Sequence, residues 1–116
     1  MSLYETDPEF MERFDHFALD EVVNEPGQEL EDTTRYLAIL AVLTGCQGVD
    51  TFKEVLPKAL DAGLSPVMVK EMVYQAVDYL GMGRVLPFLR AVNEILTDRG
   101  VKLPVSYTHL TLPTIA

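Results

Sequence analysis

Cys46 is the only thiol in the chain and the residue whose type most directly suggests chemistry. It stands between Gly45 and the Gln47-Gly48 pair, just ahead of a segment with helical periodicity. Backbone N–H groups at a helix start favour the thiolate form of a nearby cysteine, which is the reactive form. A lone cysteine is also among the residues most often buried and inert. Cys46 is therefore either a candidate nucleophile or a packing residue.

His16 and Tyr79 are the other candidates for catalysis. The candidates for binding a substrate are Gln75, Arg35 and Arg84. His16 can exchange a proton near neutral pH. Tyr79 follows Gln75 on one predicted helix. Arg35 and Arg84 stand beside helix ends, where a guanidinium could hold a carboxylate through two hydrogen bonds. The alternative for each of these side chains is a packed, solvated or ion-paired role.

The expected positions of Glu54 and Glu71, and the absence of zinc-ligand spacing in the sequence, argue against a metal site. Glu54 and Glu71 lie on amphipathic helices, and we expect them on solvated faces. The sequence has no Cys-x-x-Cys pair and no zinc-ligand spacing. We therefore expect neither a metal nor another cofactor.

Apolar periodicity predicts an all-α domain of about five helices with short connections. No segment of the first 104 residues alternates as a strand does. Pro57 predicts a kink or a later start of its helix, and Pro87 falls near a first turn, where it is harmless. The expected helices cover residues 8–23, a run from Asp32 to about Gly45, residues 52–60, residues 66–80 after Ser65, and residues 85–96.

Charge is distributed unevenly and argues against two classes of partner. The chain of 116 residues has a net charge of −9. Residues 1–32 hold eleven acids and one base, whereas residues 33–116 hold seven acids and eight bases. Nucleic acids and anionic membranes require clustered positive charge, so we expect neither as a partner. The acidic segment is a solubilising helix or, alternatively, an acidic docking surface.

Composition also indicates the cellular setting. One cysteine cannot form an intramolecular disulfide, no apolar run approaches the roughly 20 residues of a membrane helix, and no signal peptide is visible. We therefore expect a reduced, cytoplasmic setting.

The last twelve residues differ from the rest in kind. Residues 105–116 contain no charged residue and three threonines, and the string SYTHLTLPT is similar to translated sequencing-adapter readthrough. We therefore expect a single domain over residues 1–104 and a dispensable tail, and we exclude His109 as a site residue. The alternative is that residues 105–116 form a β-like segment that docks on a neighbouring subunit.

Several motifs occur in an order typical of one family. Together they resemble the carboxymuconolactone decarboxylase family, within the alkylhydroperoxidase D-like superfamily, over roughly residues 8–100. The motifs are FDHFALDEV at 14–22, TRYLAILA at 34–41, GCQG at 45–48, ALDAGLSP at 59–66, VKE at 69–71 and YQAVDYLG at 74–81. The resemblance implies an all-α fold and a homo-oligomer, a trimer or a hexamer. It implies either decarboxylation of a muconolactone carboxylic acid or peroxide reduction by a cysteine pair.

The chain departs from both of these chemistries. Cys46 matches the first cysteine of the redox motif, but Val49 replaces the second. Lys53 stands where the redox motif has histidine, and Thr34 stands where it has an upstream glutamate. Val55 aligns with the histidine of the decarboxylases. A two-cysteine relay within one chain is therefore impossible.

Three functions stay open. The first is an enzyme acting on a small molecule by decarboxylase or lactone chemistry, with Gln75 and Tyr79 retained from the family pattern. The second is a one-cysteine peroxidase that uses Cys46 and an external thiol. The third is a non-catalytic oligomeric partner protein. Residues 66–80 are apolar on two faces, and we expect the second face to be covered by another subunit.

Overall fold

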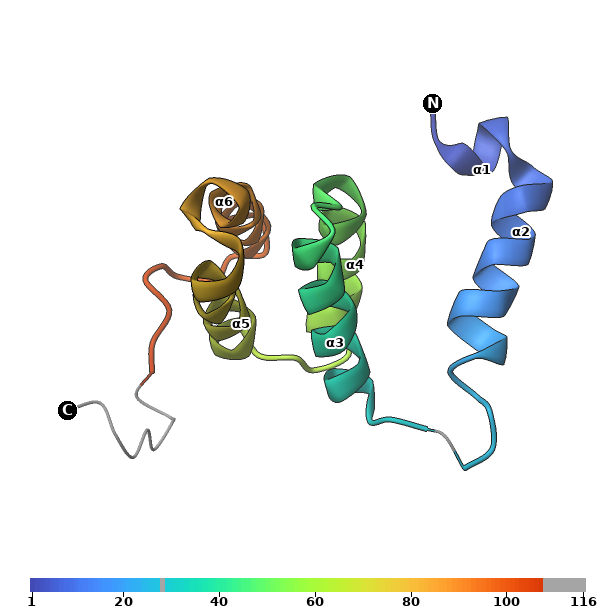
Figure 1. Cartoon of the computed structure of the whole chain (residues 1–116), viewed down its shortest axis with the longest axis horizontal. Coiled ribbons are helices and arrows are strands. Elements are labelled where there is room, and N and C mark those ends of the chain that lie inside the picture. Colours follow the sequence, from blue (N-terminus) through green and yellow to red (C-terminus); the bar gives the residue numbers. More distant parts are fainter. Residues whose placement is uncertain (28, 108–116) are drawn as a thin grey trace. The chain divides into compact units, whose positions relative to one another are not determined.

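The computed structural model describes residues 1–27 and 29–107, and within these residues all regular secondary structure is helical. The expectation of an all-α fold is confirmed. The chain divides into two compact units, Met1–Glu31 and Asp32–Ala116, which we call the arm and the body (Figure 1). The expectations for His109 and the rest of residues 108–116 lie outside the described residues.

The arm contains the short helix α1 (Leu3–Thr6), helix α2 (Pro8–His16) and the π-helical turn η1 (Phe17–Glu21). Pro8 occupies the first turn of α2, where its missing N–H is harmless. The expected helix over 8–23 is therefore present, but it widens into a π turn and ends at Glu21. Helix α1 was not expected from the sequence.

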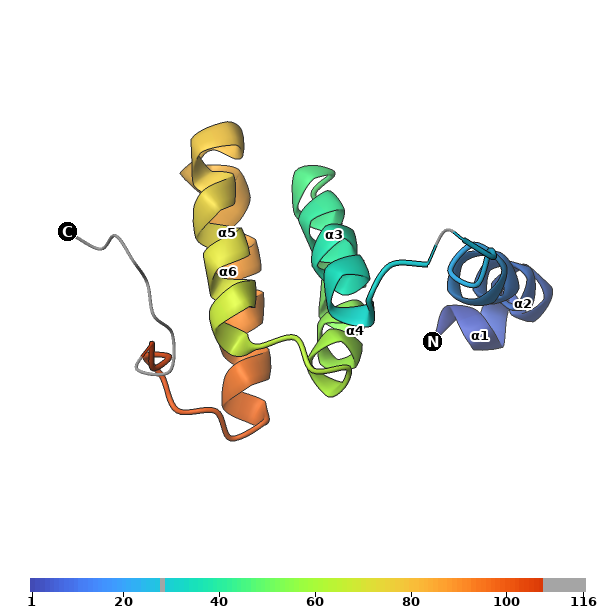
Figure 2. The ribbon, with the colours of Figure 1, turned by 90° about the horizontal axis from the view of Figure 1, so that it is seen from below.

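The body consists of α3 (Asp32–Gly45), α4 (Val49–Asp61), α5 (Pro66–Leu80) and α6 (Met82–Asp98). Helix α3 packs against α4 and α5, and α6 packs against the same two helices (Figures 1 and 2). These are the four helices that the sequence predicted for this region. Among the described helices, none combines the length and the apolar character needed to cross a membrane.

Large aliphatic and aromatic side chains from all four helices form the core of the body. Phe52 and Phe88 meet edge to face, with their ring centroids 5.1 Å apart. Both side chains are almost completely buried. The other large buried side chains of this core are Leu40, Leu56, Leu64, Val69, Val73, Val85, Val92 and Leu96.

Two prolines lie deeper in their helices than the sequence indicated. Helix α4 begins at Val49 and continues past Pro57, so the expected later start is wrong. Helix α6 begins at Met82, which makes Pro87 its sixth residue and places it beyond the first turn. Ser65 caps α5 as expected, because its hydroxyl oxygen accepts a hydrogen bond of 3.1 Å from the backbone N–H of Met68.

Candidate functional site

An open groove of about 610 Å³ lies on the body between α3 and α5. Its lining is apolar except for four side chains, which come from Thr34 on α3 and from Glu71, Gln75 and Tyr79 on α5. The apolar lining residues are Leu37, Ala38, Ala41, Met68, Met72 and Ala76. A mostly apolar concavity with a few polar groups is the usual form of a small-molecule site.

Helix α5 presents the polar groups as a single line. Glu71, Gln75 and Tyr79 are four residues apart, so they lie above one another on successive turns of the helix. Met68, Met72 and Ala76 form the neighbouring apolar line, with the same spacing. The groove therefore offers hydrogen-bonding groups along one edge and hydrocarbon beside them.

Glu71 was expected on a solvated face, whereas in the structure it lines the groove and is only partly exposed. Its Oε1 accepts a hydrogen bond of 2.7 Å from the hydroxyl of Tyr107. This hydrogen bond, followed by burial and by the negative charge of Glu71, raises the pKa of Tyr107 to about 12. The carboxylate is thus fixed in position by a neutral phenol.

Tyr107 and Val105 fall within the tail that the sequence analysis set aside. Val105 packs against the core of the body, together with Val101 and Leu103. Val101, Leu103, Val105 and Tyr107 therefore contact the helices of the body. The domain boundary at residue 104 stays a prediction.

Cys46 lies directly after α3, and its side chain is exposed. The alternative of a buried cysteine is therefore wrong. The thiol makes a long contact of 3.7 Å with the carbonyl oxygen of Leu43, and Gln47 beside it has a positive φ of 64°. Cys46 does not line the groove.

Neither candidate arginine lines the groove. Arg35 donates a hydrogen bond of 2.8 Å to the carboxylate of Asp32, and its guanidinium lies 4.7 Å from the centre of the Tyr36 ring. Arg84 is exposed near the start of α6. The proposed clamp for a carboxylate is therefore not assembled among the residues that line the groove.

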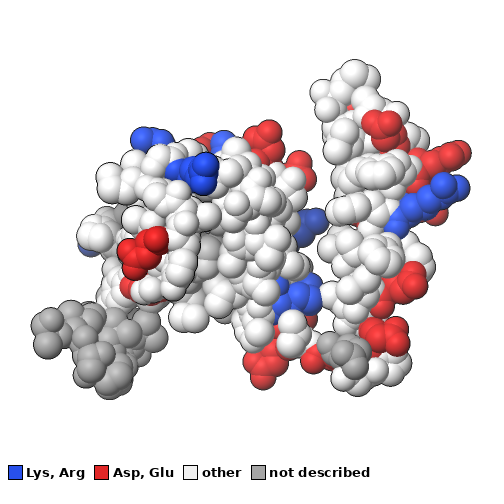
Figure 3. Space-filling model, in the orientation of Figure 1, with Lys and Arg blue, Asp and Glu red and all other residues white. Residues whose placement is uncertain are grey.

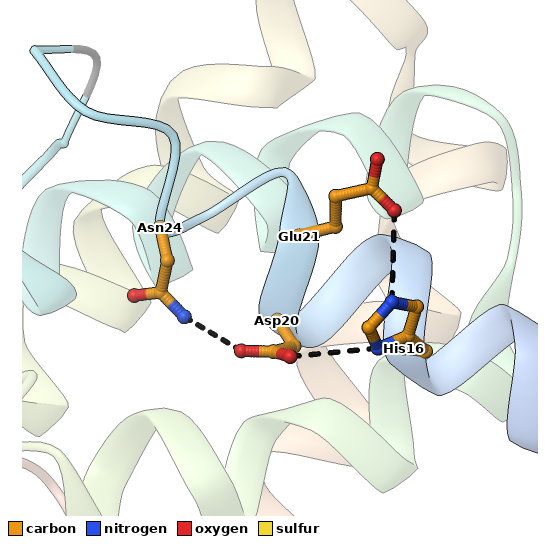
Figure 4. Close-up of polar contacts among 4 residues, drawn as sticks. All are labelled: His16, Asp20, Glu21 and Asn24. Atoms are coloured by element: carbon orange, nitrogen blue, oxygen red, sulfur yellow. Dashed lines mark hydrogen bonds and ion pairs between the residues drawn. The ribbon is translucent and has the colours of Figure 1, made fainter.

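His16 belongs to the arm, where it lies between two carboxylates (Figure 4). Its Nδ1 is 3.5 Å from Asp20 and its Nε2 is 3.7 Å from Glu21. Asn24 donates a hydrogen bond of 2.9 Å to the other oxygen of Asp20. These groups are exposed, and across residues 1–27 and 29–107 no three His, Cys, Asp or Glu side chains are placed to hold a metal ion.

The structure thus brings together Gln75 and Tyr79 from the predicted site, and adds Glu71 and Thr34. Cys46, Arg35 and Arg84 lie elsewhere on the body. The four-residue spacing of Glu71, Gln75 and Tyr79 was the signal that could have identified Glu71. Thr34 occupies the position that the resemblance assigned to an upstream glutamate.

The body is an α-helical domain with an apolar groove that carries a line of polar groups along one edge. The model of the carboxymuconolactone decarboxylase family matches residues 8–94, and the chain belongs to this family. No significant match to the chain is found among the curated proteins or among the solved structures. The resemblance described from the motifs is confirmed.

Proposed function

We propose that the protein binds a small, largely apolar carboxylic acid in the α3–α5 groove and removes its carboxyl group, as in lactone-type decarboxylation. The observation that carries the proposal is the line of Glu71, Gln75 and Tyr79 along the edge of an otherwise apolar groove. Membership of the carboxymuconolactone decarboxylase family supports the class of reaction.

The apolar lining suits this chemistry because decarboxylation disperses a localised charge. The carboxylate is strongly solvated before reaction, and the transition state spreads its charge over the substrate. None of the ten residues that line the groove is a lysine or an arginine. The apolar lining displaces part of the water around the substrate carboxylate, and so lowers the cost of reaching the dispersed state.

The polar line supplies the remaining steps. The bond between the carboxyl carbon and the ring breaks, carbon dioxide leaves, and the electron pair stays on the substrate. Gln75 donates an amide hydrogen bond to the substrate oxygen on which negative charge develops. Tyr79 gives its hydroxyl proton to the substrate carbon, and solvent then returns a proton to Tyr79, whose side chain is 88% exposed.

Glu71 has a different role in this scheme. Its carboxylate is engaged by Tyr107 and lies one turn from Gln75. We propose that Glu71 orients the substrate by accepting a hydrogen bond from a substrate hydroxyl.

Turnover of carboxylated lactones by the purified full chain tests the proposal. Loss of ring absorbance and release of carbon dioxide are measured for the wild type, Tyr79→Phe and Gln75→Leu. We expect Tyr79→Phe to lower kcat about 10²-fold or more, the usual contribution of a proton donor. The matched control is Asp78→Asn, an exposed neighbour on α5 outside the groove lining, which should leave kcat unchanged. Equal activity of Tyr79→Phe and wild type would contradict the proposed role of Tyr79.

A second function is supported by the exposure of Cys46. In this alternative the thiolate attacks peroxide, the O–O bond breaks, and a sulfenic acid and water form after protonation. An external thiol then reduces the sulfenic acid through a mixed disulfide. Peroxide consumption that is lost in Cys46→Ser but kept in Tyr79→Phe would favour this function over decarboxylation.

The third function is that of a non-catalytic partner protein. In that case the wild type has no activity, so neither Tyr79→Phe nor Cys46→Ser changes a measured rate.

We also propose a cytoplasmic location, because the only cysteine is unable to form an intramolecular disulfide and suits a reducing compartment.

A further inference from the structure

A second, smaller concavity of about 250 Å³ adjoins the groove where α3 begins, and we call it the end pocket. It is formed by the first turns of α3 and by the connection that leads into α5, two segments that lie side by side in Figures 1 and 2. Thr34, Leu37 and Met68 line both concavities, so a ligand bound in the groove can extend into the end pocket. The other lining residues are Thr33, Gly63, Leu64 and Ser65.

Three hydroxyl groups line the end pocket, and they belong to Thr33, Thr34 and Ser65. The hydroxyl oxygen of Ser65 already accepts a hydrogen bond of 3.1 Å from the N–H of Met68, which leaves its proton available for donation. Within the part of the chain that the structure describes, the hydroxyls of Thr33 and Thr34 make no hydrogen bond. The end pocket therefore holds hydroxyl donors that are available to an acceptor atom of a ligand.

We propose that the hydroxyls of Thr33, Thr34 and Ser65 bind an uncharged carbonyl oxygen at the far end of the substrate. This inference rests on the proposed function, from which it takes the position of the carboxyl end at Gln75 and Tyr79. It adds the class of substrate, which is a monocarboxylic acid with a second, keto or ester, group at the opposite end.

The absence of basic side chains favours a carbonyl over a second carboxylate. A carboxylate that leaves water needs a cation or several donors to replace its hydration. The linings of the groove and of the end pocket hold no Lys, Arg or His. The reacting carboxylate is discharged as carbon dioxide, whereas a second carboxylate would stay charged throughout the reaction. A neutral carbonyl oxygen needs only one or two O–H donors.

The spacing of residues on α5 sets the length of this substrate. Gln75 lies ten positions after Ser65, which corresponds to about 15 Å along the helix axis. An extended chain covers about 1.2 Å per bond, so about twelve bonds separate the two oxygen-bearing ends. The apolar side chains between these ends, among them Leu37 and Met72, suit the hydrocarbon part of such a chain.

The test compares the binding of two acids of equal length to the full chain. The probes are dodecanoate and the derivative of dodecanoate that carries a ketone on the carbon next to its methyl end. Neither probe has a carbonyl close enough to its carboxyl group to promote loss of carbon dioxide, so titration calorimetry measures binding alone. We expect the wild type to bind the keto acid about 5-fold more tightly, which is the usual contribution of a hydrogen bond.

The variant Thr33→Val removes one hydroxyl and keeps the branched shape of the side chain, with a similar helix propensity. We expect the preference for the keto acid to fall below about 2-fold, while dodecanoate binds as tightly as to the wild type, which shows that the variant is folded. The matched control is Thr51→Val, which changes an exposed threonine in the first turn of α4 outside both linings. This control should keep the full preference.

Three results would overturn the inference. The first is equal affinity of the wild type for the two acids, or binding of neither. The second is a preference that persists unchanged in Thr33→Val. The third is tighter binding of dodecanedioate than of the keto acid, which would assign the end pocket to a charged group.

The outcomes for the two proposals are distinguishable, because the binding experiment needs no turnover. A preference for the keto acid without decarboxylation of any carboxylated lactone would contradict the decarboxylase function alone. Decarboxylation without a preference for the keto acid would contradict the role of the end pocket alone.

Discussion

The arm and the body are both helical, but they differ in what their apolar residues contact. In the body, Phe52 and Phe88 are almost completely buried against each other. In the arm, Phe10 and Phe14 also stack, with centroids 6.3 Å apart, yet they are 63% and 49% exposed. The arm buries one large apolar side chain, that of Met11. An amphipathic helix is stabilised mainly by a second layer that covers its apolar stripe, and only the body has such a layer of its own.

Charge separates the two units in the same way. The charged side chains of the arm are acidic except for Arg13, whereas the body carries acids and bases in equal number over residues 32–107 (Figure 3). Like charges along a helix oppose its formation. The arm is therefore the weaker unit on both counts.

The largest predicted effect is in the aromatic core. Phe52→Ala should lower the free energy of unfolding by about 3–5 kcal/mol, because it removes a fully buried ring and leaves a cavity. Phe14→Ala in the arm should lower it by less than about 1 kcal/mol, since the ring is half exposed. Urea unfolding followed by circular dichroism measures both values. Equal losses would show that the arm is packed as tightly as the core.

A smaller effect is expected at Lys70, a buried ammonium of the body. Its Nζ donates a hydrogen bond of 2.5 Å to Oδ1 of Asn93 and lies 5.7 Å from the centre of the Tyr74 ring. Asn93→Ala leaves the buried charge without this acceptor and should cost about 1–3 kcal/mol of unfolding free energy. Asn93→Asp restores an acceptor and is the control. A loss in Asn93→Asp as large as in Asn93→Ala would contradict this account.

The helix caps allow the two units to be compared directly. Ser65→Ala removes the capping hydrogen bond of α5 and should cost about 1 kcal/mol, because an N–H of the first turn loses its acceptor. Ser2 occupies the equivalent position before the four-residue helix α1. Ser2→Ala should leave the unfolding midpoint unchanged. A larger shift for Ser2→Ala than for Ser65→Ala would reverse the ranking of the units.

The smallest effect is a pH dependence at Tyr107. Its pKa of about 12 in the folded protein exceeds the ordinary value of 10.0 because Glu71 accepts its hydrogen bond. The neutral phenol therefore favours folding, and this contribution is complete below pH 10 and is lost as the pH rises through about 12. Ultraviolet titration of the wild type against Tyr107→Phe isolates the transition of this tyrosine. A midpoint near pH 10 would show that the contact with Glu71 is absent in solution.

The helices of the body were predictable because local signals agree with the packing. Ser65 and Pro66 mark the start of α5, and Phe52 and Leu56 fall on the buried side of α4, as their spacing indicated. The π turn after His16 was not predictable, because a run of apolar and acidic residues fits both an α-helix and a π-helix.

The candidate site was predictable only in part. Gln75 and Tyr79 followed from the family resemblance, and the spacing of residues on one helix extends to Glu71. Arg35 pairs with Asp32 and does not line the groove. The spacing of residues along the chain does not determine which partner an arginine side chain contacts. The distance along the chain between Cys46 and α5 likewise contained no information on whether the thiol reaches the groove.

The π turn has a consequence for how the arm tolerates insertions and deletions. A π turn accommodates one residue more than an α-turn, and it changes the angular phase of every residue that follows. In the wider turn, His16 meets both Asp20 and Glu21, which are four and five positions ahead (Figure 4). Removal of one residue within Phe17–Glu21 would convert the segment into continuous α-helix and rotate Val22 and Val23 to a new direction. The directions in which Val22 and Val23 point therefore depend on the number of residues in this turn.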